Sequence, residues 1–198
     1  MGTRNVTIVK LDGKVVIAKY CQWDGYINGQ GLDLCNFIRN DLDLRKLKNN
    51  IRKCYTISDE KADEIFDDYL DQKTKLSVKD RLDYDKTKAL QMKLVPTLTR
   101  DTGGGDILKA IQDQGGLPLS DNKGSLDYAK GTGEMSFGCE YCYEVDLDNK
   151  TVGIYDGHYK AKNLLKTYSF RSIKTVKSIE KTLENLENNI NAIYELQA

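Results

Sequence analysis

The sequence has little histidine, proline or tryptophan, and it has no long apolar segment. Its 198 residues include one histidine, two prolines and one tryptophan. No stretch approaches the ~20 apolar residues that a membrane-spanning helix needs. The first residues also lack the apolar run and the small-residue cleavage site of a signal peptide. We therefore expect a cytoplasmic protein that does not bind membranes.

The sequence also lacks a net charge. Thirty Lys and Arg residues balance thirty Asp and Glu residues, so no overall field draws the molecule to nucleic acid or to an anionic membrane. Hydrophobic residues make up 39% and charged residues 30% of the chain, which is typical of a folded globular protein rather than a disordered one. Nucleic-acid binding would therefore need a local basic patch.

Cysteine is present in an odd number and at irregular spacings. Five cysteines argue against a secreted disulfide framework and predict reduced thiols. Cys139 and Cys142 have CxxC spacing, but no second pair exists. If this segment is a strand, residues three apart point to opposite faces and do not readily share one metal ion. We predict no metal site and no cofactor.

Catalytic signatures are sparse. The chain has neither a Gly-x-Ser-x-Gly elbow nor a His-Glu-x-x-His motif. A Cys21 nucleophile with His158 as its base is conceivable from the inventory of residues alone. The N-terminal segment is superficially similar to that of N-terminal-nucleophile hydrolases, but removal of Met1 would expose Gly2, which has no nucleophile. These observations favour a protein that is not an enzyme.

Two hairpin patterns are separated by helical ones. Apolar residues from Val6 onward alternate with polar residues before a turn at Asp12 and Gly13, after which residues 15–20 return. Aromatic and β-branched residues flank an Asp-Asn turn over 135–155 in the same way. The expected fold is α+β, an antiparallel sheet built from both hairpins and covered by helices.

Helical patterns occupy the remaining segments. Ser58 is placed to cap a helix whose first turn is acidic. Apolar residues at alternating four- and three-residue spacings make the C-terminal segment the clearest helix. The segments expected to contain helix are 32–47, 58–71, part of 73–93, a short helix ending near 111, and 178–196.

The patterns predict one domain with an appended helix. A chain of this length suits a single domain, here residues 1–177, with a long loop over about 114–133 that is rich in Gly, Ser, Asp and Asn. Residues 178–198 form an amphipathic helix that packs on the domain or on another copy of the chain. A homo-oligomer through this helix is one alternative.

The most distinctive segment is the loop at residues 21–31, which contains Gln22, Trp23, Asp24 and Tyr26. An aromatic plate, a carboxylate and glycine backbone can together present a ligand site. In the structural alternative, the glycines supply positive φ angles while Trp23 and Tyr26 pack under the hairpin.

A second glycine-rich loop contains Arg100, Asp101 and Asp106. Successive backbone N–H groups before a helix can hold an anion. The loop lacks the Lys-Ser or Lys-Thr ending of a Walker A motif. The alternative is a plain helix start capped by Asp101 or Asp106.

A basic segment with interleaved aromatic residues lies near the C-terminus. It forms a nucleic-acid patch or faces an acidic surface, either residues 59–71 of the same chain or a partner. The basic residues that define the patch are Lys160, Lys162, Lys166, Arg171, Lys174 and Lys177.

Four sequence blocks resemble a protein family common in bacterial phages and prophages. They read Gly-Thr-Arg-Asn-Val-Thr at 2–7, Gln-Trp-Asp-Gly-Tyr-x-x-Gly-Gln-Gly at 22–31, Arg-Asp-Thr-Gly at 100–103, and Glu-Tyr-Cys-Tyr-Glu-Val-Asp-Leu-Asp at 140–148. The resemblance implies a setting, a bacterial host cell, rather than an activity. Small phage accessory proteins often bind and inhibit host proteins, including anti-phage defence components such as CRISPR effectors.

Three functions follow as hypotheses. The first is a non-catalytic phage-type accessory protein that binds a host macromolecule, in the manner of an anti-defence inhibitor. The second is a small-molecule site or hydrolase, for a nucleotide or sugar, formed by Trp23, Asp24 and residues 100–106. The third is a nucleic-acid-binding module that uses residues 160–181.

Overall fold

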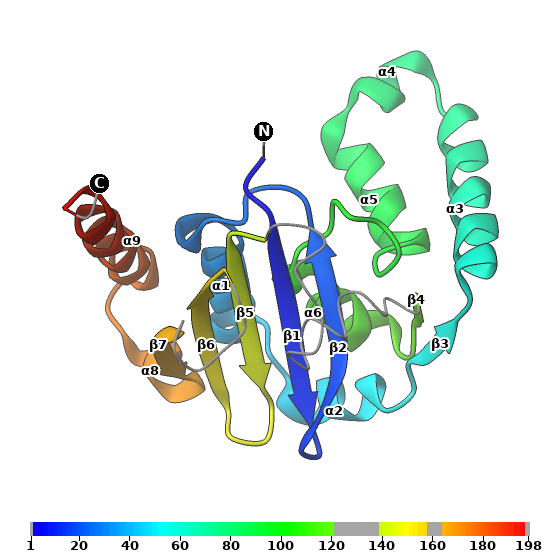
Figure 1. The fold of residues 1–198 in the computed structure, drawn as a ribbon. Coiled ribbons are helices and arrows are strands. Elements are labelled where there is room, and N and C mark those ends of the chain that lie inside the picture. The colour runs from blue at the N-terminus through cyan, green and yellow to red at the C-terminus, as the bar shows by residue number, and fades with distance from the viewer. Residues whose placement is uncertain (1, 121–138, 158–163, 197–198) are drawn as a thin grey trace.

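A computed structural model describes residues 2–120, 139–157 and 164–196. A five-stranded sheet forms the centre of the molecule, helices cover one of its faces, and a helical arm projects from one side (Figure 1). The α+β class expected from the sequence is confirmed. The strands are β1 (Asn5–Leu11), β2 (Lys14–Cys21), β3 (Tyr55–Ile57), β4 (Pro118–Ser120), β5 (Tyr141–Asp146), β6 (Thr151–Asp156) and β7 (Leu164–Ser169).

The large sheet has the strand order β2-β1-β5-β6-β7. The β1–β2 and β5–β6 pairs are antiparallel, as is β6–β7, but β1 and β5 run parallel. The sheet is therefore mixed, and the expectation of a wholly antiparallel sheet was wrong at this pair. Alternation within a hairpin specifies its own register but not the direction of its neighbour, because a long helical connection permits either direction.

Helices pack on the face of the sheet that carries Val9, Leu11, Val145 and Ile154, and together they enclose the main hydrophobic core. The helices are α1 (Leu32–Asn40), α2 (Leu44–Ile51), α3 (Asp59–Thr74), α4 (Val78–Leu82), α5 (Tyr84–Leu94), α6 (Gly104–Gln114), α8 (Phe170–Thr175) and α9 (Ile179–Glu195). Among the described helices, none has the length and apolar character that crossing a membrane requires.

The single helical pattern over residues 32–47 corresponds to two helices. Asp43 ends the continuity because its side chain accepts a hydrogen bond from Lys46 N and caps α2. Gln112 of α6 satisfies the backbone at the break, donating to Asp41 O at 2.9 Å and accepting from Asp43 N at 2.8 Å. A capping residue and a tertiary partner thus interrupt an apolar spacing that runs through both helices.

Helices α3, α4 and α5 form the arm (Figure 1). Ser58, Ser77 and Asp83 cap these helices, each accepting a hydrogen bond from a backbone N–H three residues on. The cap at Ser58 confirms the predicted helix start. The base of the arm is tied to the body by the short parallel pair β3–β4. Residues 118–120, expected to be loop, supply β4, while 121–133 lie outside the described residues.

Helix α9 packs on its own chain. Ile179, Leu183 and Ile190 are buried in the main core, and the Glu187 carboxylate accepts from Ile27 N and Asn28 N at 3.3 Å each. Arg39 adds a link from α1 to the segment before α9, donating to the Ile173 and Val176 carbonyls. These contacts favour the alternative in which the C-terminal helix packs on the domain.

The opposite face of the sheet carries a smaller cluster that contains Val6, Ile8, Cys139 and Cys142. Cys139 precedes β5, so the opposite-face rule for strand residues does not apply to it, and both cysteines reach the same cluster. Both thiols are free, and burial raises the pKa of each, to about 12 for Cys139. They are packing residues with little thiolate character.

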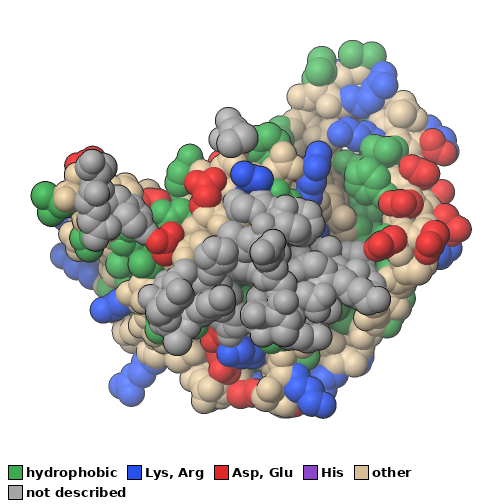
Figure 2. Space-filling model, in the orientation of Figure 1, with side chains coloured by type: hydrophobic (Ala, Val, Ile, Leu, Met, Phe, Trp, Pro, Cys, Tyr) green, Lys and Arg blue, Asp and Glu red, His purple; other side chains and the backbone are tan. Residues whose placement is uncertain are grey.

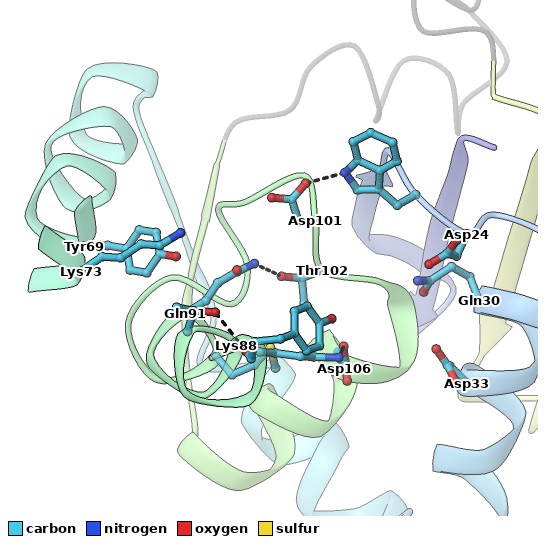
Figure 3. Close-up of a pocket in the computed structure, with 14 residues that line it drawn as sticks. Asp24, Gln30, Asp33, Tyr69, Lys73, Lys88, Gln91, Asp101, Thr102 and Asp106 are labelled. Carbon is cyan, nitrogen blue, oxygen red and sulfur yellow. Dashed lines mark hydrogen bonds and ion pairs between the residues drawn. The ribbon is translucent and has the colours of Figure 1, made fainter. Parts of the chain in front are cut away.

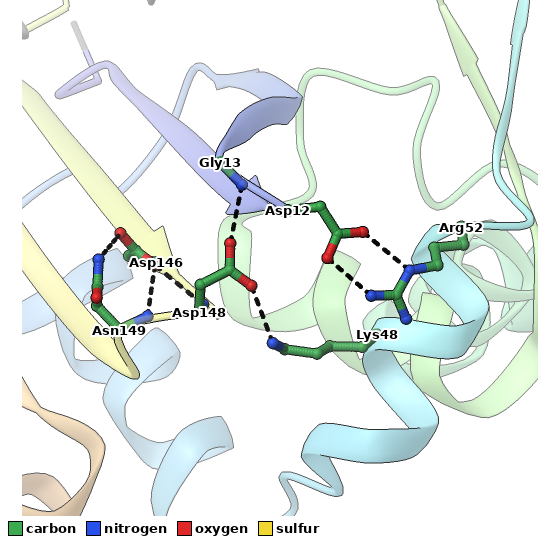
Figure 4. Close-up of polar contacts among 7 residues, drawn as sticks. All are labelled: Asp12, Gly13, Lys48, Arg52, Asp146, Asp148 and Asn149. Atoms are coloured by element: carbon green, nitrogen blue, oxygen red, sulfur yellow. Dashed lines mark hydrogen bonds and ion pairs between the residues drawn. The ribbon is translucent and has the colours of Figure 1, made fainter.

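The turn end of the sheet, after β1 and β5, is closed by partnered carboxylates (Figure 4). Asp12 accepts two hydrogen bonds from the Arg52 guanidinium at 2.9 and 3.0 Å. Asp148 accepts from Gly13 N and from Lys48 Nζ at 3.0 Å each. These contacts join the two turns to each other and to α2.

Candidate functional site

Two loops that the sequence singled out lie together at the other end of the sheet. Gln22 N donates to Arg100 O at 2.9 Å. The Trp23 indole N–H donates to Asp101 Oδ1 at 2.9 Å, the dashed line at Asp101 in Figure 3. Two loops whose bonded residues are 78 positions apart in the sequence therefore lie side by side. The indole ring is fixed by its bond to Asp101 and remains about half exposed.

The residue with positive φ in the first loop is Asp24, at 52°. Its carbonyl accepts from Gln30 N at 2.8 Å. The glycines instead permit close approach, since a Cβ on Gly25 would lie 2.8 Å from Thr3 O and one on Gly29 would overlap the Asp24 carbonyl. The expectation that the loop glycines supply positive φ was wrong, and a non-glycine residue in this region is a strained position often found at functional sites.

The expectation that Trp23 and Tyr26 pack under the hairpin was also wrong. Their exposed fractions are 47% and 49%. The loop ends in a π-helical turn over Ile27–Gly31 that leads into α1. The polar end of Tyr143 fixes it from below, donating from its hydroxyl to Gly25 O at 2.7 Å. Hydrogen bonds therefore hold the backbone of the loop in place while its two large aromatic side chains are about half exposed.

The second glycine loop opens α6 without a side-chain cap, so neither Asp101 nor Asp106 caps the helix. Its glycines are buried and allow α6 to pack closely on its neighbours. A Cβ on Gly104 would overlap the Thr7 side chain, and one on Gly105 would lie 2.8 Å from Asp33 O. Close helix packing explains these glycines better than an open anion cradle does.

A pocket of about 520 Å³ opens between these loops and the arm. Figure 3 shows Asp24, Gln30 and Asp33 on one wall and Tyr69 and Lys73 across from them. From the body, the lining includes Trp23, Asp24, Gln30, Asp33, Asp101, Thr102 and Asp106. From the arm, it includes Tyr69, Lys73, Tyr84, Lys88 and Gln91.

A buried polar network joins the arm to the second loop. Gln91 of α5 donates to the Thr99 hydroxyl at 2.8 Å and to the Thr102 hydroxyl at 3.2 Å. Thr99 in turn accepts from Asp101 N at 3.0 Å. Lys88 forms an ion pair with Asp106 at 3.0 Å. The arm therefore has a defined position beside the pocket although it buries few of its own residues.

The residues that line the pocket carry a net negative charge. Four carboxylates and two ammonium groups line it. Burial raises the pKa of the Asp33 carboxyl, and the charges of Asp106 and Asp24 raise it further against the opposing charge of Lys88. Neighbouring negative charge therefore adds to burial in disfavouring the ionised form of Asp33.

The structure places the seven predicted loop residues in three locations. Trp23, Asp24, Asp101 and Asp106 all line the pocket. Gln22 and Arg100 join the two loops through their backbones. Tyr26 lies apart from them, in a second hollow of about 460 Å³ that also contains Tyr141 and Glu187.

The pocket residues of the arm were missed. The sequence of α3 to α5 has capping signals and charge but no apolar spacing that marks Tyr69, Tyr84 or Lys88 as part of a site. Their role depends on where the arm lies relative to the body. Only the tertiary structure supplies that information.

The predicted basic patch is only partly described, since Lys160 and Lys162 lie outside the described residues. Lys166, Arg171, Lys174 and Lys177 are exposed. The aromatic residues between them, however, pack in or against the main core, with Phe170 buried and Tyr168 half-buried. Within this part of the chain they are not free to stack on bases.

The described part of the basic patch, residues 166–177, does not face the acidic segment of the same chain. β7 and α8 lie on the side of the sheet opposite the arm that carries residues 59–71 (Figure 1). For these residues the expectation was wrong within the molecule, because the edge strand β2 and the arm are on one side while β7 forms the other edge. A partner surface remains the alternative for each charged region.

The proposed Cys21 nucleophile is poorly placed for catalysis. Burial raises the pKa of the Cys21 thiol, which lowers its thiolate fraction at neutral pH. His158, its suggested base, lies outside the described residues. No group of three or more His, Cys, Asp or Glu residues suited to a metal ion occurs among residues 2–120, 139–157 and 164–196.

A buried lysine lies on β2 near the pocket loops. Lys19 is 7% exposed and pairs across the sheet with Thr7, on the helix-covered face. Burial lowers the pKa of Lys19 to about 8, although Cys21 and Asp101 partly oppose the shift. The described residues offer its ammonium no hydrogen bond, so Lys19 is a costly feature at this end of the sheet.

Comparison of the chain with protein-family models, curated proteins and solved structures found no match. The geometry and chemistry of the site are therefore the basis for its function.

Proposed function

We propose that this chain is a non-catalytic binding protein that attaches to a basic surface of a host protein through its arm and the adjoining pocket. The main support for this proposal is the low burial of the arm. Helices in proteins gain most of their stability by burying an apolar face. Yet Tyr69 is the single buried residue of α3, and neither α4 nor α5 has one.

The arm exposes large apolar side chains that the rest of the described chain leaves mostly uncovered. Val78, Leu82 and Tyr84 are 65%, 82% and 70% exposed. Figure 2 shows hydrophobic side chains at the tip of the arm and acidic side chains along its outer edge. Large exposed apolar groups rimmed by polar ones are typical of protein-binding surfaces.

Charge indicates the kind of surface that the arm meets. Helix α3 carries seven acidic residues and two lysines, and the pocket beside it has an excess of negative charge. This part of the surface repels nucleic acid and anionic membranes and attracts basic protein surfaces. Helices α4 and α5 together carry five basic residues and two acidic ones, so they contribute the exposed apolar side chains rather than the negative charge. In the phage setting that the resemblance implies, occupation of a basic host surface would act as an anti-defence inhibitor does.

The test compares capture of host protein by wild type and by the double variant Val78→Asp/Leu82→Asp. Bacterial lysate is passed over each immobilised protein, and the retained proteins are identified and then titrated in purified form. We expect one basic protein to be retained by wild type, with at least tenfold weaker binding to the double variant and weaker binding at high salt.

The matched control is Ile193→Asp, an apolar position on α9 at the far side of the molecule whose side chain is also exposed, at 53%. It also tests the alternative in which copies of the chain associate through that helix. Loss of the captured protein with Ile193→Asp, but not with the arm variant, would overturn the proposal. So would the absence of any protein that depends on the arm.

The second candidate function is binding of a nucleotide or sugar in the pocket. Its volume of about 520 Å³ is within the range of small-molecule sites, which favours this candidate. Trp23 is the only tryptophan, so its fluorescence reports on this pocket alone. Saturable quenching by a nucleotide or sugar, lost in Asp24→Ala with unchanged thermal unfolding, would support it.

A further inference from the structure

We infer that the pocket between the arm and the Trp23 loop receives a cationic side chain, lysine or arginine, from the partner protein. This inference rests on the proposed function and specifies the chemistry of its central contact. It follows from three features of the pocket: its aromatic faces, its uncompensated carboxylates and the ammonium groups that its walls already accommodate.

The aromatic faces come from both sides. Trp23 is held by its hydrogen bond to Asp101, and Tyr69 and Tyr84 belong to the arm. The face of an aromatic ring attracts a cation, most strongly for tryptophan. The pocket already shows this contact, because the Lys73 ammonium lies 5.9 Å from the centre of the Tyr69 ring.

The carboxylates are only partly compensated. Asp106 pairs with Lys88, and Asp101 accepts the indole N–H of Trp23. The carboxylates of Asp24 and Asp33 make no hydrogen bond or ion pair with the residues that the structure describes. Both are on the same wall of the pocket, facing the arm (Figure 3).

One cation between Asp24 and Asp33 would satisfy this arrangement. It would give both carboxylates a partner and leave the Lys88–Asp106 ion pair and the Trp23–Asp101 hydrogen bond intact. A guanidinium can donate to both carboxylates while it stacks on the indole ring. A phosphate or carboxylate ligand would instead meet like charge on this wall.

The experiment uses Trp23 fluorescence and capped amino acids. Wild type is titrated with N-acetyl-arginine amide, N-acetyl-lysine amide and the neutral isostere N-acetyl-citrulline amide. We expect saturable changes with arginine and lysine, and at least about tenfold weaker binding of citrulline, because it lacks the charge. Binding of citrulline as tight as that of arginine would overturn the inference.

The variants Asp24→Asn and Asp33→Asn keep the size of each side chain and remove its charge. Each is expected to weaken binding of the arginine compound by about tenfold. Glu184→Gln is the matched control, since it removes one exposed negative charge from α9, outside the pocket, and leaves binding unchanged. Equal loss in all three variants would show long-range attraction only and would overturn the inference.

A small free amine is the competing occupant. If putrescine binds at least tenfold more tightly than the arginine compound, the pocket is a site for a small molecule. That result would overturn the inference that it receives a side chain of the partner protein. The outcome is separable from that of the proposed function. If the captured host protein depends on Val78 and Leu82 but binds Asp24→Asn and Asp33→Asn normally, the proposed function stands and this inference fails.

Discussion

The two ends of the central sheet treat carboxylates in opposite ways. At the turn end, hydrogen bonds from Arg52 lower the pKa of Asp12, and those from Gly13 N and Lys48 lower the pKa of Asp148. At the pocket end, burial and neighbouring carboxylates raise the pKa of Asp33. The carboxylates of the turn end have their hydrogen-bond donors within the chain. The carboxylates of the pocket end include acceptors that a cation from another molecule can use.

This difference distinguishes a surface that stabilises the fold from one that is available to bind a ligand. Carboxylates that accept hydrogen bonds from their own chain favour the charged form and fix local geometry. A carboxyl near other carboxylates and without such bonds favours its neutral form, and shifts of this kind are common at functional sites. Three substitutions would break or sharpen this contrast.

The largest effect is expected at Lys19, which is buried at the pocket end. Its pKa falls from the ordinary 10.5 to about 8, so its charged form costs about 3 kcal/mol at neutral pH. Lys19→Met keeps the aliphatic stem and should raise the free energy of unfolding at pH 7 by roughly that amount. Urea denaturation of both proteins measures it.

The effect of Lys19 on stability should depend on pH. Between pH 8 and 10.5 the unfolded chain binds more protons than the folded chain, so wild-type stability gains with rising pH from this group. The advantage of Lys19→Met should therefore be complete below pH 8 and shrink toward pH 10.5. An advantage that does not change over this window would show that the Lys19 ammonium is not penalised by burial.

An intermediate effect is expected at Asp101. Asp101→Ala removes the acceptor of the Trp23 indole and should cost about 1 kcal/mol of stability. It should also shift the Trp23 emission toward that of a solvated indole. Asp101→Asn keeps an acceptor and serves as the control. Identical emission from Asp101→Ala and wild type would show that the hydrogen bond does not hold the ring.

The smallest effect is expected at Asp148, whose contacts are exposed. Asp148→Asn should lower Tm by no more than a few degrees, because surface ion pairs contribute little. The wild-type contribution is present above the unfolded pKa of the carboxyl and is lost as pH falls through its lowered folded pKa. The difference in Tm should accordingly vanish in strong acid, and a constant difference would contradict this account.

The sequence allowed a good part of the fold and some of the site to be predicted. The α+β class, the capped start of α3 and the amphipathic α9 follow from local periodicity and capping. Trp23, Asp24, Asp101 and Asp106 were also singled out, because an unusual local composition marks their loops. The parallel β1–β5 pair and strand β7 were not predicted, since neither has a local signal.

What the sequence by itself determined are features that depend on residues close in the chain, namely helix periodicity, caps, turns and the identity of the two loops. The tertiary structure alone decided that these loops share one wall, that the arm closes a pocket over them, and that Asp24 and Asp33 lack partners among the described residues while Asp12 and Asp148 have them. The physical reason is that burial, charge pairing and ring exposure depend on neighbours brought together from distant positions.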